Sequence, residues 1–114
     1  MKSVRVRLDA CPLALDAQLT TRAFERMRGW LGKRRVDGRE ALLIAPCNAV
    51  HTWFMRTPID VVFLDKVGRV LAVHTALGPW RYRMHWRART ALELAPGASR
   101  RLGIVRGAAL TIES

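Results

Sequence analysis

A cysteine and a histidine four residues apart are the first candidates for chemistry. Cys47 and His51 could hold a zinc ion, or act as a nucleophile and its base, because thiol and imidazole groups serve both purposes. Along one continuous strand the pair would lie about 13 Å apart, so the two side chains meet only across a turn. His74 offers a cross-strand partner for His51 at about 5 Å, and a zinc site would still need His85 or Asp60 as a further ligand. Packing of Cys47 in the core is the alternative.

A second group of polar and aromatic side chains is embedded in otherwise apolar segments. Its members are His51, Trp53, Arg56, Asp60 and Arg81. Asp60 shares strand parity with apolar residues, and a buried carboxylate needs a guanidinium group or backbone amides as partners. The group therefore has two interpretations. It either supplies internal polar contacts, or it lines a small pocket in which Arg56 and Arg81 face an anionic ligand or a segment of a protein partner.

Segment 80–89 alternates aromatic rings with guanidinium groups. Rings that stack on bases and cations that neutralise phosphates are what single-stranded nucleic acid requires. The basic loop 33–39 would extend such a surface. The alternative is a loop whose tryptophans lie against the sheet while the arginine tips stay in water. The residues that would contact nucleic acid are Trp80, Arg83, Trp86, Arg87 and Arg89.

Composition limits the classes of protein to which these residues could belong. The chain has 114 residues, half of them hydrophobic and a quarter charged, which indicates one globular domain. The formal net charge of +11 permits a polyanionic partner, although arginines spread over an ordinary surface are the favoured explanation. Two cysteines, Cys11 and Cys47, do not make a disulfide framework. Without an apolar run of membrane-spanning length or a signal peptide, we expect a cytoplasmic location.

The known catalytic and cofactor-binding motifs give no match. The sequence has no Gly-rich phosphate loop, no nucleophile-elbow serine and no His-Glu-x-x-His helix. We therefore expect no cofactor, and we expect a binding domain rather than an enzyme.

Short strands dominate the elements that must position these candidates. Alternation over 4–8 predicts a half-exposed strand with Val4, Val6 and Leu8 facing inward. Apolar and β-branched runs predict further strands at 41–45, 50–55, 59–64, 69–77, 91–94 and 110–112. Segment 65–69 reads as a hairpin turn, 99–102 as a single helical turn and 21–31 as one amphipathic helix. The fold class is mainly β (α+β), a compact barrel or sandwich of about seven strands.

The middle of the chain carries a family resemblance. Residues 46–65 read Pro-Cys-Asn-Ala-Val-His-Thr-Trp-Phe-Met-Arg-Thr-Pro-Ile-Asp-Val-Val-Phe-Leu-Asp, which closely resembles the signature of domain-of-unknown-function family 192. Arg-Gly-Trp-Leu-Gly at 28–32, Pro-Trp-Arg at 79–81 and Leu-Glu-Leu-Ala-Pro-Gly at 92–97 extend the similarity, as do Gly103 and Gly107. Ala108 stands where members commonly have Asp. The resemblance implies a compact β-rich domain and brings no catalytic residues.

Three hypotheses follow. The first is a non-enzymatic binding or accessory domain whose pocket is formed by His51, Trp53, Arg56, Asp60 and Arg81. The second is nucleic-acid binding through 80–89. The third is an enzyme or metal site formed by Cys47 with His51 or His74.

Overall fold

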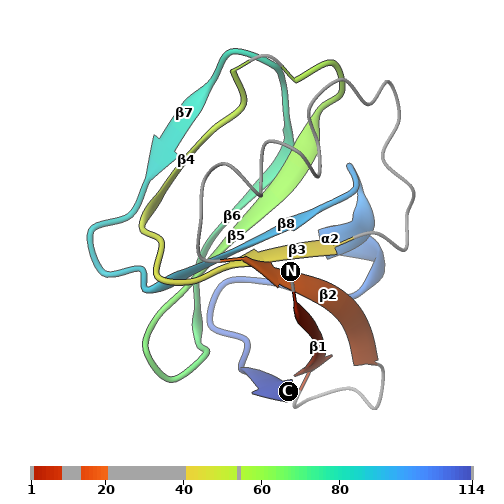
Figure 1. Ribbon diagram of the computed structural model, residues 1–114, viewed down its shortest axis with the longest axis vertical. Helices are drawn as coiled ribbons and strands as arrows, with labels where there is room; N and C mark the ends of the chain where they lie inside the picture. Colours follow the sequence, from red (N-terminus) through yellow and green to blue (C-terminus); the bar gives the residue numbers. More distant parts are fainter. Residues whose placement is uncertain (1, 9–13, 21–40, 54, 114) are drawn as a thin grey trace.

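The fold is seen in a computed structural model that describes residues 2–8, 14–20, 41–53 and 55–113 (Figure 1). These residues form nine strands and one short helix, so the mainly β prediction is confirmed. The amphipathic helix predicted at 21–31, the basic loop 33–39 and Cys11 lie outside the described residues. The elements are β1 (Lys2–Leu8), β2 (Ala14–Thr20), β3 (Ala41–Ile44), β4 (Ala49–His51), β5 (Ile59–Leu64), β6 (Val70–Leu77), β7 (Tyr82–Met84), β8 (Thr90–Leu94), α2 (Ala98–Arg101) and β9 (Leu110–Glu113).

Seven of these strands form one sheet in the order β6-β5-β8-β3-β2-β1-β9, and β4 pairs with β7 in a separate two-stranded sheet. Neighbouring strands are antiparallel except β2 and β3, which are parallel. The two edge strands of the large sheet are β6 and β9. The residues that immediately precede them, Arg69 and Ala109, form an isolated antiparallel bridge. Among the described residues the pairing of these edges does not continue along β6 and β9. A closed barrel, one form of the predicted fold, is therefore wrong: the sheet curls but stays open at one seam.

Burial follows the sequence pattern. In β1, Val4, Val6 and Leu8 are buried while Arg5 and Arg7 are exposed, which confirms the predicted alternation. All six residues of β5 are buried. A strand that is covered on both faces needs apolar residues at both parities, and Val61, Val62 and Phe63 supply them. The core lies along β5 and β8.

The turn between β5 and β6 confirms the predicted hairpin. Asp65 Oδ1 accepts hydrogen bonds from the backbone N–H groups of Val67 at 3.0 Å and Arg69 at 2.9 Å. The hydrogen bond from Arg69, more than the opposing effect of burial, holds the pKa of Asp65 below its ordinary value. Gly68 has φ of 89°, and a Cβ at this position would collide with the carbonyl of Leu110. The hairpin is thus fixed by its own turn and by its contact with the start of β9.

Candidate functional site

Asp60 is fully buried and holds three segments together. It lies at an irregularity in the pairing of β5 with β6. Its Oδ1 accepts the N–H of Ala76 at 2.8 Å and of Gly97 at 3.2 Å. Its Oδ2 accepts the N–H of Ser99 at 3.0 Å and the hydroxyl of Ser99 at 2.6 Å. Since all four partners donate, the carboxyl group acts purely as an acceptor.

These contacts favour the internal interpretation of Asp60. Ala76 has φ of 48°, a left-handed conformation that a non-glycine residue seldom adopts, and its hydrogen bond to Asp60 helps to hold it there. Within the described residues neither Arg56 nor Arg81 forms an ion pair with this carboxylate. Both arginines are exposed. The structure does not bring Asp60 together with the arginines that were grouped with it.

Two of the grouped residues, His51 and Trp53, lie at the two-stranded sheet. Tyr82 lies opposite His51 in the register of β4 and β7, and Met84 lies opposite Ala49. The rings of His51 and Trp53 are in contact, with centroids 4.8 Å apart. Tyr82 and Met84 are exposed, whereas Val50, which points to the opposite face, is buried. One face of this small sheet therefore carries aromatic side chains in water.

Thr52 fixes the loop that carries Trp53. Its hydroxyl donates to the carbonyl of Gly78 at 2.6 Å and accepts the N–H of Arg81 at 2.8 Å. Its backbone N–H and C=O are also used, bonding Arg81 and Trp80 respectively. Thr52 is completely buried. It ties the end of β4 to the loop before β7, so Trp53 and Arg81 are presented by two segments that are hydrogen-bonded to each other.

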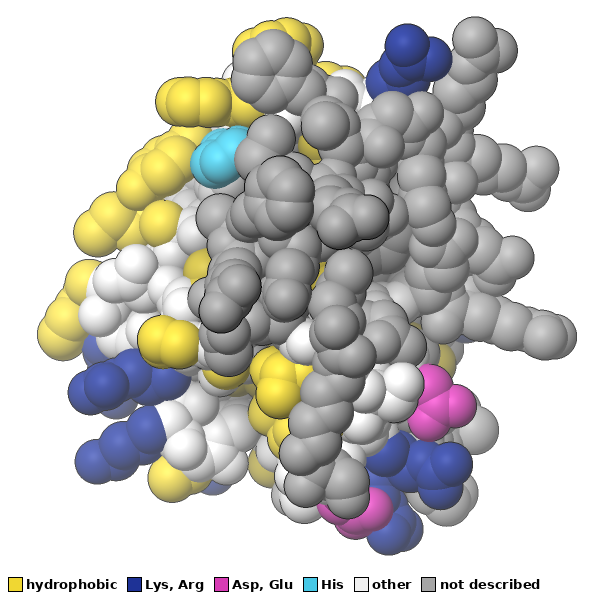
Figure 2. Space-filling model, viewed as in Figure 1, with side chains coloured by type: hydrophobic (Ala, Val, Ile, Leu, Met, Phe, Trp, Pro, Cys, Tyr) yellow, Lys and Arg dark blue, Asp and Glu magenta, His cyan; other side chains and the backbone are white. Residues whose placement is uncertain are grey.

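Exposed apolar groups are concentrated here. Five of the eight large hydrophobic side chains exposed in the described part of the chain lie on β7 or in the loops beside it. We call these five the aromatic surface: Trp53, Trp80, Tyr82, Met84 and Trp86, which are exposed by 48%, 59%, 53%, 56% and 78%. In Figure 2 hydrophobic side chains gather at the upper left, where Figure 1 places β7 and β4. Exposed apolar patches are more typical of interaction sites than of the ordinary surface of a monomer.

The stretch of chain that carries most of the aromatic surface has only positive charges. Between Asp65 and Glu93 the sequence has six Lys or Arg residues and no acidic residue. Arg81, Arg87 and Arg89 are exposed, and the guanidinium of Arg87 lies 5.9 Å from the ring centroid of Trp86. Arg83 is different, because it lies opposite buried Val50 and is only half-exposed. The acidic side chains visible in Figure 2 lie at the lower right, away from the hydrophobic group.

The cysteine and histidines have separate neighbours. The thiol of Cys47 donates to the carbonyl of Ala49 at 3.0 Å. The sequence suggested His74 as a cross-strand partner of His51, but His51 pairs with Tyr82 instead. His74 pairs with Val61 across β5 and β6, and its ring meets Phe63 edge-on. His85 Nδ1 accepts the N–H of Arg87 at 3.2 Å. No group of three metal-ligating side chains is found among the residues that the structure describes.

The pKa of His74 is lowered from its ordinary value. Burial is the larger cause, and the positive charge of Arg83 adds to it. His74 therefore favours its neutral form next to the core.

The comparisons with known proteins identify the family. The family model described as uncharacterized ACR, domain of unknown function 192, matches residues 2–112. The chain belongs to this family. The resemblance seen in residues 46–65 is thus confirmed over nearly the whole chain.

Two solved structures share the fold of this family member. One is a protein of Sinorhizobium meliloti 1021 described as a putative transcription regulator, with a TM-score of 0.80, 20% identity, and coverage of 96% of this chain and 91% of that one. The other is a protein of unknown function from Novosphingobium aromaticivorans, with a TM-score of 0.79, 18% identity, and coverage of 96% and 83%. At this identity the likeness shows the fold alone. A comparison with curated proteins gives no match.

Membership of domain-of-unknown-function family 192 therefore accounts for the fold that positions these residues and assigns no activity. Two exposed residues of the aromatic surface, Tyr82 and Met84, were not predicted as functional, because they were read as part of a loop. Their signal was the alternation Trp-Arg-Tyr-Arg-Met over 80–84, which is a strand pattern with its apolar side outward. No helix in the described part is long and apolar enough to cross a bilayer.

Proposed function

We propose that this domain is a non-enzymatic binding module that takes an anionic ligand on the aromatic surface. The observation that supports it is the coincidence of exposed rings with a stretch of chain that carries only positive charge. Exposed rings cost free energy in water and gain it when a flat ligand covers them. Guanidinium groups beside them favour a ligand that also carries carboxylate, phosphate or sulfate.

His51, Trp53 and Arg81 are the centre of the proposed site. The rings of His51 and Trp53 are in contact at the end of β4. Arg81 lies beside them in the chain fold, because its N–H donates to the hydroxyl of Thr52, the residue between them. Arg56 is exposed beyond the same loop and adds charge to the approach of the ligand. Asp60 belongs to the frame, because its four acceptor positions are occupied by Ala76, Gly97 and Ser99.

Titration calorimetry with ATP and with tripolyphosphate tests this proposal, since one probe has a ring and the other only charge. Arg81→Ala should weaken ATP binding by about tenfold, the value of a charge-assisted hydrogen bond. Arg100→Ala is the matched control, because Arg100 is also exposed but lies on α2, and it should leave the affinity nearly unchanged. Equal weakening by both variants would reduce the interaction to general charge and contradict the proposal.

Single-stranded nucleic acid is the second candidate. It is favoured by the two most exposed rings, Trp80 and Trp86, which stand on either side of β7, together with the exposed Arg87 and Arg89. Bases stack on such rings whatever their sequence, and guanidinium groups neutralise the phosphates between them. Arg83 is half-buried beside β4 and fits this role less well than the sequence suggested.

A fluorescence titration with a twelve-nucleotide thymidine strand separates the two candidates. If the strand contacts three arginines, the logarithm of affinity should fall with that of salt concentration with a slope of about −2. Trp86→Ala should then weaken the strand by roughly tenfold, since one stacked base contributes about 1–3 kcal/mol. If Trp86→Ala binds the thymidine strand as tightly as the wild type does, nucleic acid is excluded as the ligand of this surface. That result would leave the small anionic ligand, which depends on His51, Trp53 and Arg81.

A further inference from the structure

The open seam of the large sheet is separate from the aromatic surface. The seam is the gap between β9 and the hairpin that joins β5 to β6. At its closed end the two segments are joined by hydrogen bonds from Val70 N–H to Ala108 C=O at 2.8 Å and from Leu110 N–H to Gly68 C=O at 2.9 Å. Beyond Gly68 the hairpin turns away, because Gly68 N–H bonds back to Asp65 C=O at 3.1 Å. The ladder stops there while β9 continues.

The backbone of Ile112 faces this gap. In an antiparallel strand the N–H and C=O groups of residues i and i+2 point to the same side. Leu110 donates toward the hairpin, so Ile112 presents its N–H and C=O in the same direction, while Thr111 and Glu113 face β1. No hydrogen bond from Ile112 on this side occurs among the described residues. The edge thus offers one more rung of a ladder that has already started.

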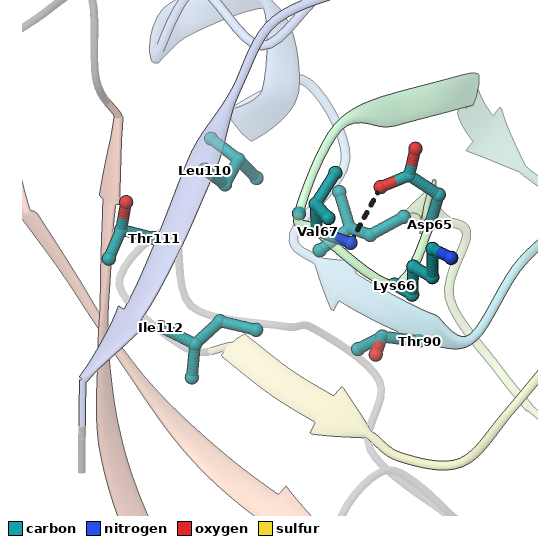
Figure 3. A pocket seen from close by; sticks show the side chains of 9 residues that line it. Asp65, Lys66, Val67, Thr90, Leu110, Thr111 and Ile112 are labelled. Atoms are coloured by element: carbon teal, nitrogen blue, oxygen red, sulfur yellow. Dashed lines mark hydrogen bonds between the residues drawn. The ribbon is translucent and has the colours of Figure 1, made fainter.

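A cavity of about 240 Å³ lies beside this edge. Figure 3 shows Leu110 and Ile112 pointing from β9 toward the hairpin, with Val67 and Thr90 across the space from them and Thr111 pointing away. Val67 and Ile112 are exposed by 71% and 40%, so the walls are partly apolar and open to water. The volume is below the range usual for small-molecule sites, about 300–1,000 Å³, but it suffices for one or two side chains of a strand.

We propose that the seam binds an extended segment of a partner protein, which adds to β9 as a further strand. The backbone groups of Ile112 that meet no partner in the described part of the chain would pair with an extended backbone, and the cavity takes the side chains that alternate toward it. Continuity with the existing bridge at Arg69 and Ala109 sets the position of the added strand. Lys66 lines the cavity and is exposed, and Arg69 is exposed at the neighbouring bridge. The carboxylate of Asp65 is held by its own turn, so acidic residues at the ends of the segment are favoured.

The peptide Asp-Glu-Val-Thr-Val-Thr-Val-Glu-Asp is the probe, and the same peptide with both threonines replaced by proline is its control. Both peptides carry the same charges and the same three valines, but the control lacks the N–H groups of the two threonines and cannot form a regular ladder at those positions. We expect the control to bind at least about fivefold more weakly, one hydrogen bond's worth. In amide exchange followed by NMR, the N–H of Ile112 should exchange rapidly in the free protein and slow at least tenfold when the probe is bound.

Ile112→Pro is the matched variant. It removes only an N–H that faces the seam, so the pairing of β9 with β1 and the unfolding midpoint should persist while the probe binds at least about fivefold more weakly. Ile112→Val should bind like wild type. Equal binding of the two peptides would overturn the proposal, and so would slow exchange of Ile112 in the free monomer. A doubled mass in solution that Ile112→Pro abolishes would also overturn it, by assigning the edge to a second copy of the chain. None of these results bears on ligand binding at the aromatic surface.

Discussion

Replacing Asp60 tests whether the buried carboxylate is part of the frame. Asp60→Ala leaves four donors without their acceptor, namely the N–H groups of Ala76, Gly97 and Ser99 and the hydroxyl of Ser99. The two donors of Ser99 are buried and cannot reach water, and each such loss costs about 1–3 kcal/mol. Ala76 and Gly97 are exposed residues whose N–H groups can take up water. Since removal of the buried carboxylate also recovers part of its desolvation cost, we expect the free energy of unfolding to fall by about 3 kcal/mol in total.

Urea unfolding and thermal melting of Asp60→Ala and of a control variant provide the measurement. A loss of about 3 kcal/mol in a domain of this size lowers the melting temperature by roughly 10–15 °C. Asp16→Ala is the matched control, because its carboxylate is 81% exposed and makes one long contact of 3.4 Å with Arg5. It should change stability by about 0.5 kcal/mol or less. Equal stability of Asp60→Ala and Asp16→Ala, with ligand binding lost only in the first, would refute the reasoning and return Asp60 to the binding site.

Three further perturbations follow from the same contacts. Thr52→Val keeps the shape but removes the hydroxyl that bonds Gly78 C=O and Arg81 N–H, so it should cost about 2 kcal/mol in urea unfolding; a loss below about 0.5 kcal/mol would contradict this role. Asp65→Ala should destabilise the hairpin by about 1–2 kcal/mol, and Asp65→Asn by less, as seen in melting curves; no change in either would count against the turn. The lowered pKa of His74 means that the unfolded chain takes up its proton more readily. Stability should therefore fall as pH drops below about 6.5 toward the folded pKa, and His74→Gln should flatten this dependence; an unchanged slope would show that other groups cause it.

Local patterns were sufficient for most strands. The strand at 59–64 has the predicted bounds, because five apolar residues out of six between Pro58 and a turn favour little else. The hairpin at 65–69 was predictable because Asp65 and Gly68 stabilise the turn within the segment itself. β1 showed its buried side through alternation.

Long-range pairing explains what was missed. β2 was not predicted, because Ala-Leu-Asp-Ala-Gln-Leu-Thr has little strand propensity, and its place depends on β1 and on parallel pairing with β3. β7 has only three residues and exists through its pairing with β4, which is more than thirty residues away in the chain. The predicted strand 50–55 stops at His51, because Thr52 bonds the loop before β7.

The candidate site was predicted in part for the same reason. His51, Trp53 and Arg81 are brought near one another, and each was chosen for its own chemistry. Asp60 was assigned to a pocket because its partners, Gly97 and Ser99, lie almost forty residues along the chain. Parity showed that Asp60 is buried, but nothing in the local sequence shows which donors it meets.

The most direct test of ligand binding at the aromatic surface is an amide NMR titration of the protein with ATP. The account predicts shifts concentrated at residues 49–53 and 80–87, which saturate together and shrink in Arg81→Ala but persist in Arg100→Ala. Shifts scattered over the arginines of β1, α2 and the loop before β9, unaffected by Arg81→Ala, would contradict it.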